Sequence, residues 1–389
     1  MLDKLTRNAR IDLLRGIAIL LVLLLHFHLS YRLDQIALLA WVPESILQML
    51  LRNGNYGVTM FFVISGFLIT RTTQQHWDRL GQVDVLGFYA NRFARIIPPL
   101  LLALIVIIVL GCADLPSFMN SDAGNGFPNA FFFIAGVSVL TFWHNVLMQH
   151  VGYFNYALNI YWSLSVEEIF YLFFPLLCLL LSRQRLILLA CCLLIITGPI
   201  YRSIHADNEL YFMYGYWACF DAIALGVATA LIAPRVPQLG WYVMPLQYGA
   251  VLLITFTFWQ GIIGHEIFGF SLIALGTAVL LLFAGSDVEK GRTFTSLSAR
   301  SLRLMGRYSY ELYLFHIVLL GLLRTLIPPE SMGSPMKLVW LFIYLITSVL
   351  LAKVIAYYFS EPVNTKIRAA FAELRLKKSM PDFRLPDTE

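Results

Sequence analysis

The chain has 389 residues, of which 59% are hydrophobic and only 13% are charged, and its formal net charge is +5. This composition excludes an ordinary soluble globular protein and is typical of a chain embedded in lipid. The apolar residues gather in blocks of about 17 to 25 residues, the length that a helix needs to cross the hydrocarbon core.

The first apolar block spans residues 13–31 and follows the basic residues Lys4, Arg7 and Arg10. A cleaved signal peptide begins in the same way, but no small-residue cleavage site follows His28, so we interpret the block as a retained span. Further blocks of spanning length lie at residues 56–71, 95–113, 162–181, 186–202, 214–233, 241–260, 266–284, 305–324 and 337–359. The prediction is an all-α polytopic membrane protein of about ten transmembrane helices.

Residues 127–143 form an additional apolar stretch, and whether it crosses the membrane sets the orientation of every later segment. If the amino terminus is cytoplasmic and this stretch does not cross, most Lys and Arg residues lie on the cytoplasmic side, as the positive-inside rule requires. The basic residues left outside are then Arg32, Arg52, Arg202, Arg324 and Lys337. A full crossing would move the basic cluster from Lys290 to Arg307 outside. We therefore predict a re-entrant or interfacial segment at 127–143 and two cytoplasmic termini.

The chain shows no internal repeat and no second segment large enough for its own core. Residues 1–360 are expected to form one membrane domain, and residues 361–389 a basic cytoplasmic tail that lies as an amphipathic helix on the anionic leaflet. All five cysteines lie in or beside apolar blocks without the spacing of a zinc site, so we interpret them as packing residues and expect no metal.

Several ionisable residues lie inside the expected spans, where a charge costs a few kcal/mol or more and indicates a functional role unless a structural partner explains it. These residues are His26, Glu167, Glu168, Asp221 and His316. The predicted orientation places them between the midplane and the outer leaflet, so we expect them to meet at one cavity. A single histidine in a bundle more often bonds a neighbouring backbone group, but two histidines with several acids favour function.

A second set of charged residues is expected at the cytoplasmic helix ends. It consists of Arg15, Arg71, Arg92, Arg95, Arg303 and Arg307. Ordinary positive-inside anchoring explains most of them, and binding of a polyanionic ligand by planar guanidinium groups is the alternative. Arg15 and His26 are separated by about 16 Å along one helix, so one end of that helix can hold phosphates while the other carries out chemistry.

Five motifs in order resemble those of the membrane acyltransferase-3 family. They are Ile11–Ala18 with His26, Gly57–Ile69, Phe88–Pro98, Trp162–Tyr171, and Ser309–His316 with the late pair Glu361 and Pro362. The resemblance covers nearly the whole chain. Thr59 stands where the family often has Asp, and Ile169 where it often has Gln, which bears on acceptor or acyl preference. No hydrolase domain of the SGNH type follows, so we expect the membrane unit to work alone.

The resemblance implies O-acylation, commonly O-acetylation, of a carbohydrate or other hydroxylated cell-envelope acceptor at the bacterial inner membrane. The implied donor is acyl-CoA, most often acetyl-CoA, and the expected partners are the donor, the acceptor and the lipid bilayer. No nucleic acid is expected, and a homodimer is left open. The main rival is a proton-coupled secondary transporter or flippase, but the chain lacks the paired broken helices that such a protein would show.

Roles for the charged residues follow from their expected depth. Arg15, Arg92 and Arg95 are expected to bind the phosphates of CoA, because they lie at the cytoplasmic end. His26 is expected to be the general base, either for direct transfer or through an acyl-histidine, because a neutral imidazole accepts a proton near operating pH. Glu167 is expected to orient the imidazole, and His316 to assist with the acceptor or the thioester carbonyl.

Overall fold

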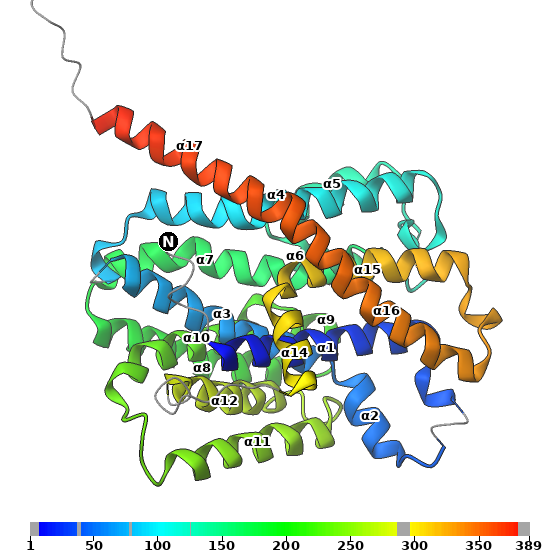
Figure 1. Cartoon of the computed structure of the whole chain (residues 1–389), viewed down its shortest axis with the longest axis horizontal. Helices are drawn as coiled ribbons and strands as arrows, with labels where there is room; N and C mark the ends of the chain where they lie inside the picture. Colours follow the sequence, from blue (N-terminus) through cyan, green and yellow to red (C-terminus); the bar gives the residue numbers. More distant parts are fainter. Residues whose placement is uncertain (1–7, 37–39, 78–79, 125, 286–295, 380–389) are drawn as a thin grey trace, which may run out of the picture.

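The computed structural model describes residues 8–36, 40–77, 80–124, 126–285 and 296–379. Within these ranges the regular secondary structure consists of helices without any strand (Figure 1). In lipid the backbone must satisfy its own hydrogen bonds, and a helix does so within one segment. The prediction of an all-α polytopic membrane protein is confirmed.

Each predicted span contains one long helix. These helices are α1 (Ala9–Tyr31), α3 (Asn55–His76), α4 (Val85–Cys112), α7 (Trp162–Leu181), α8 (Gln184–Ile204), α10 (Tyr216–Ile232), α11 (Val243–Gln260), α12 (Gly269–Leu282), α15 (Ser309–Leu326) and α16 (Ser334–Ile355). Seven helical segments of the described chain are long and apolar enough to cross a membrane. Helix α12 is apolar but has only 14 residues, and α3 and α11 are less apolar than those seven.

In the described part of the chain, six further α-helices lie between the spans or after the last one. They are α2 (Glu44–Arg52), α5 (Phe131–Leu140), α6 (His144–Val151), α9 (Glu209–Phe212), α14 (Leu297–Arg307) and α17 (Glu361–Ser379). Within the stretch 127–143 only α5 is helical, and its ten residues extend about 15 Å, half the thickness of the hydrocarbon core. Helix α5 is therefore too short to cross alone, which agrees with an interfacial or re-entrant segment.

Two pairs of helices cross with their backbones in direct contact. A Cβ atom on Gly66 of α3 would collide with the Ile223 carbonyl of α10, and a Cβ atom on Gly226 would collide with the Val63 carbonyl. Helices α1 and α14 meet in the same reciprocal way, because Gly16 faces the Leu302 carbonyl and Gly306 faces the Asp12 carbonyl. Small residues at such crossings allow the close packing that holds helices together in lipid. These contacts set the position of α1 against α14 and the start of α15.

A buried ion pair ties α8, α10 and α12 together. The fully buried Arg202 donates from Nη2 to Asp221 Oδ2 at 2.7 Å and to Ser271 Oγ at 2.6 Å. Its other donors reach the carbonyls of Ile267 and Ala218. Asp221 therefore has a structural partner, and the prediction that it joins the functional cavity is wrong. Arg202, expected outside, reaches inward from the last turn of α8.

Helix α17 continues the line of α16 after a π-helical turn at Ala356–Ser360 and projects past the other helices (Figure 1). It runs beside the first part of α4, where Arg375 pairs with Asp84, the residue that precedes α4. The start of α4 and the carboxy-terminal helix thus lie at the same end of the bundle.

Candidate active site

A cavity of about 150 Å³ lies between helices α1, α3, α4, α7 and α15. Its charged lining residues are Arg15, Arg92, Arg95 and Glu167, and most of the other lining residues are apolar or aromatic. The three arginines that the sequence predicted as phosphate ligands therefore share one cavity. Arg92 and Arg95 are three residues apart, a spacing that brings two side chains to one face of α4.

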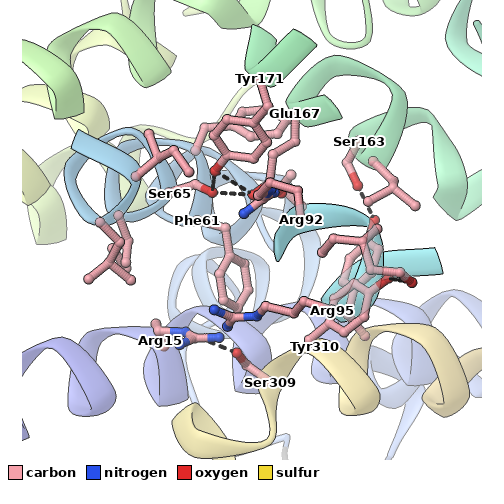
Figure 2. Close-up of a pocket in the computed structure, with 18 of the residues that line it drawn as sticks. Arg15, Phe61, Ser65, Arg92, Arg95, Ser163, Glu167, Tyr171, Ser309 and Tyr310 are labelled. Carbon is pink, nitrogen blue, oxygen red and sulfur yellow. Dashed lines mark hydrogen bonds and ion pairs between the residues drawn. The ribbon is translucent and has the colours of Figure 1, made fainter. Parts of the chain in front are cut away.

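Arg15 and Arg95 form the cationic end of this cavity. Figure 2 shows their guanidinium groups beside each other, with Phe61 between them and the group of Ser65, Glu167 and Tyr171. Arg15 donates from Nε to Ser309 Oγ at 3.1 Å. Within the described ranges neither Arg15 nor Arg95 forms an ion pair with a carboxylate. Two neighbouring guanidinium groups that no carboxylate contacts directly are an arrangement that favours a multiply charged anion.

Arg92, in contrast, is already paired. Its Nη2 donates to Glu168 Oε1 at 2.6 Å and lies 3.8 Å from Glu167 Oε1. Its guanidinium carbon lies 3.7 Å from the centre of the Tyr171 ring, which adds a cation–π contact. Arg92 is therefore less available to a phosphate than Arg15 or Arg95.

Ser65, Tyr171 and Glu167 form a compact hydrogen-bonded group on the cavity wall (Figure 2). Glu167 Oε1 accepts from Tyr171 Oη at 2.8 Å and from Ser65 Oγ, and the two hydroxyls also contact each other. Ser65 and Tyr171 were not predicted from the sequence as site residues. The spacing of four residues between Glu167 and Tyr171 was the available signal, because it places both side chains on one face of α7.

His26 of α1 and His316 of α15 form a pair, although 290 positions separate them in the chain. His26 Nδ1 and His316 Nε2 are 3.3 Å apart, and the ring centroids are 5.0 Å apart. His316 is buried and His26 is half-buried. Each Nδ1 also faces backbone carbonyl oxygens of the preceding turn of its own helix.

Tyr313 borders both the cavity and the histidine pair. It lines the cavity, and its ring centroid is 5.9 Å from that of His316, whereas neither histidine lines the cavity. The Tyr313 hydroxyl donates to the Ile160 carbonyl at 2.7 Å and lies 2.6 Å from Ser163 Oγ. These contacts hold the tyrosine ring at the boundary between the arginine cavity and His316.

The expected meeting of all five ionisable residues at one cavity is wrong. The structure divides them into the histidine pair, the Arg92–Glu167–Glu168 group and the Arg202–Asp221 pair. Glu167 is not the partner of His26 as predicted, because its carboxylate is engaged with Ser65 and Tyr171. The glutamates pair with Arg92 because α4 starts at Val85, ten residues before the expected span. Arg92 therefore lies about two turns along the helix, within reach of both glutamates.

Comparison with known proteins shows where the chain belongs. An O-acetyltransferase OatA of Staphylococcus aureus (strain MRSA252) is 29% identical over 354 residues, which are 85% of this chain and 56% of that protein. A peptidoglycan O-acetyltransferase OatA of Listeria monocytogenes serovar 1/2a (strain ATCC BAA-679 / EGD-e) is 23% identical over 334 residues, 80% of this chain and 49% of that protein. The chain thus spans about half the length of these relatives.

No solved structure matches the chain. The sequence profile of the acyltransferase-3 family, described as an acyltransferase domain, matches residues 8–357. This match extends from the start of α1 into the π-helical turn after α16, so it includes the arginine cavity and the histidine pair. The chain belongs to the acyltransferase-3 family of membrane proteins.

Proposed function

We propose that this protein is an integral membrane O-acyltransferase, and more narrowly an O-acetyltransferase, that moves an acyl group from acyl-CoA to a hydroxyl of a carbohydrate or another cell-envelope acceptor. Membership of the family and the names of the staphylococcal and listerial relatives support the reaction class. The observation that carries the proposal is the cavity in which Arg15 and Arg95 lie together and form no ion pair with any carboxylate of the described residues.

The donor site is the cationic end of the cavity. CoA carries several phosphate groups, and guanidinium groups bind phosphate oxygens through parallel hydrogen bonds. Arg15 and Arg95 are the primary ligands in this proposal. Arg92 contributes less, because Glu168 already occupies its Nη2. The pantetheine arm then extends along the apolar lining towards Tyr313, and the thioester approaches the histidine pair when that ring turns aside.

His26 is the proposed general base. It removes the proton from the acceptor hydroxyl, the oxygen bonds to the thioester carbon, and the carbon–sulfur bond breaks. The CoA thiolate takes the proton back from the imidazolium, so CoA leaves as the thiol. Glu167 acts in this scheme at the donor cavity, where it holds the hydroxyls of Ser65 and Tyr171 in the wall. The chemistry requires no metal.

The arrangement fits a protein of the bacterial inner membrane with both termini in the cytoplasm. In that orientation the arginine end of α1 meets cytosolic acyl-CoA, and the histidine end meets an acceptor that arrives from the other side. The distribution of Lys and Arg along the sequence supports this orientation. The charged part of the donor then never has to enter the hydrocarbon core.

The test is transfer of label from acetyl-CoA in membrane vesicles that contain the full chain. His26→Ala is expected to abolish the transfer while the thermal unfolding of the protein stays unchanged, and His265→Ala, at an exposed histidine in a loop, serves as the matched control. Wild-type vesicles that never label a hydroxylated acceptor, across peptidoglycan, lipopolysaccharide, exopolysaccharide and small glycosides, would falsify the proposal.

A further inference from the structure

The positions of the ring protons in the histidine pair follow from their neighbours. His316 Nδ1 lies 2.8 Å from the Tyr313 carbonyl oxygen and 3.0 Å from that of Leu312. A carbonyl oxygen can only accept a hydrogen bond, so this nitrogen carries the proton. A neutral imidazole has one N–H, and His316 Nε2 is therefore left with a lone pair.

The proton of His26 is located by the same reasoning. Its Nδ1 lies 2.9 Å from the Val22 carbonyl oxygen and 3.3 Å from His316 Nε2. Both neighbours are acceptors, so His26 Nδ1 carries the proton and donates to them. The remaining nitrogen, His26 Nε2, holds the lone pair and is the basic atom of the ring.

His28, two residues further along α1, has the opposite arrangement. Its Nδ1 accepts from the Leu33 backbone N–H at 3.2 Å, so its proton lies on Nε2. Two histidines on one helix thus differ in tautomer. Their immediate hydrogen-bond partners cause the difference, because the helix itself is the same.

We propose that His316 is a positioning residue, whose Nε2 accepts from the Nδ1–H of His26 together with the Val22 carbonyl oxygen, so that His26 acts through Nε2. This inference rests on the proposed function of His26 as the base. It replaces the role predicted from the sequence, in which His316 contacts the acceptor or the thioester. Both nitrogens of His316 already have partners, and the side chain is 1% exposed, so neither nitrogen is free for a substrate.

The pair also accounts for the fate of the transferred proton. When His26 takes a proton at Nε2 it becomes a cation, and the lone pair of His316 Nε2 stabilises that cation through a charge-assisted hydrogen bond. His316 cannot pass a proton onward, because its own Nδ1–H faces carbonyl oxygens. The proton therefore stays at the pair until the CoA thiolate removes it.

Two substitutions at His316 test this role in vesicles that contain the full chain. His316→Leu removes the acceptor and is expected to lower kcat about 10- to 100-fold, the range for a hydrogen bond to a charged group, while the KM values for acetyl-CoA and acceptor change by less than about threefold. His316→Gln offers an amide oxygen as a substitute acceptor and is expected to recover most of the lost kcat. Thermal unfolding and CoA binding of both variants control for folding.

Nitrogen-15 NMR of the histidine rings gives a second measurement that does not depend on activity. In the wild-type protein His26 is expected to be protonated at Nδ1 and His28 at Nε2, so the two residues serve as references for each other. In His316→Leu the Val22 carbonyl oxygen still lies 2.9 Å from His26 Nδ1, so His26 is expected to stay protonated at Nδ1 and to lose only the acceptor that stabilises its cation. If this variant does not fold, the wild-type spectrum alone still decides between the tautomers.

Three outcomes would overturn the inference. They are a wild-type His26 protonated at Nε2, equal losses of kcat in His316→Leu and His316→Gln, and a raised KM for one substrate with unchanged kcat. A different result, full activity of His26→Gln, would contradict the proposed function instead, since the tautomer of His26 could then still be as described.

Discussion

Arg92 and Glu168 form an ion pair on the side of the arginine cavity, with 2.6 Å between Nη2 and Oε1. Their side chains are 17% and 9% exposed, so both charges are largely removed from solvent. Loss of one partner leaves the other charge buried and unpaired, which is far more costly than the absence of both. This asymmetry leads to a stability prediction.

Glu168→Leu is expected to destabilise the protein by about 3 kcal/mol, because Arg92 then keeps only the more distant Glu167. The double variant Arg92→Leu with Glu168→Leu is expected to recover much of that loss. Thermal unfolding in detergent measures both effects. A double variant less stable than Glu168→Leu alone would show that the pair itself, and not the unpaired charge, dominates.

Arg15→Ala and Arg95→Ala are each expected to raise the KM for acetyl-CoA about tenfold, since each removes a charged hydrogen-bond donor. Arg92→Ala is expected to have a smaller effect on KM, because Arg92 is held by Glu168. The measurement is the initial rate of label transfer as a function of donor concentration. Arg71→Ala, on α3 outside the cavity lining, is the control. Unchanged KM values in both primary variants would return these arginines to a role in membrane anchoring.

Tyr313→Ala is expected to join the donor cavity to the space beside His316. Water can then reach the thioester, so the variant should release free CoA from acetyl-CoA without any acceptor, several times faster than the wild type. Tyr313→Phe keeps the ring and loses the hydrogen bonds to Ser163 and Ile160, so it should show little of this leak. A thiol reagent in acceptor-free vesicles measures the release. Equal release from all three proteins would mean that Tyr313 is not the barrier.

The crossing of α3 and α10 is expected to tolerate no added methyl group. Gly66→Ala and Gly226→Ala each force a Cβ atom into a backbone carbonyl of the other helix. A backbone carbonyl cannot move aside as a flexible side chain can, so each substitution should lower the free energy of unfolding by about 3 kcal/mol. Gly249→Ala is the matched control, because a Cβ atom at that position meets nothing within 4 Å. Thermal unfolding compares the three variants. A Gly66→Ala protein as stable as Gly249→Ala would contradict the close crossing.

The helical fold could be predicted because lipid imposes a minimum apolar length on each span. The depth of the site residues along their helices could not be predicted. The segment from Val85 to Phe93 carries polar residues, so hydropathy placed the start of α4 too late and left Arg92 at the rim. The motifs did indicate the three arginines of the cavity. They did not indicate that Glu167 bonds to Ser65 instead of His26, because neighbouring helix positions differ in direction by about 100° and the rotation of α7 depends on its packing.

The pairing of Asp221 with Arg202 was beyond prediction for a related reason. A charged residue in the last turn of an apolar helix can extend to the headgroups or turn inward, and only the neighbouring helices decide. Here α10, α12 and the turn before α12 supply acceptors from Asp221, Ser271 and two carbonyls, so each nitrogen of the guanidinium group has a partner inside the bundle. The position of His316 against His26 likewise depends on the tertiary contacts between the first helix and α14–α15.

Helix α1 contacts two consecutive helices near the end of the chain. Gly16 packs against α14, and His26 lies beside His316 of α15. During synthesis α1 enters the membrane long before either partner leaves the ribosome. The nascent protein must therefore keep α1 unpartnered on that face until more than 300 residues have been made. The contact between His26 and His316 therefore forms only at that late stage of synthesis, and a chain released earlier lacks it.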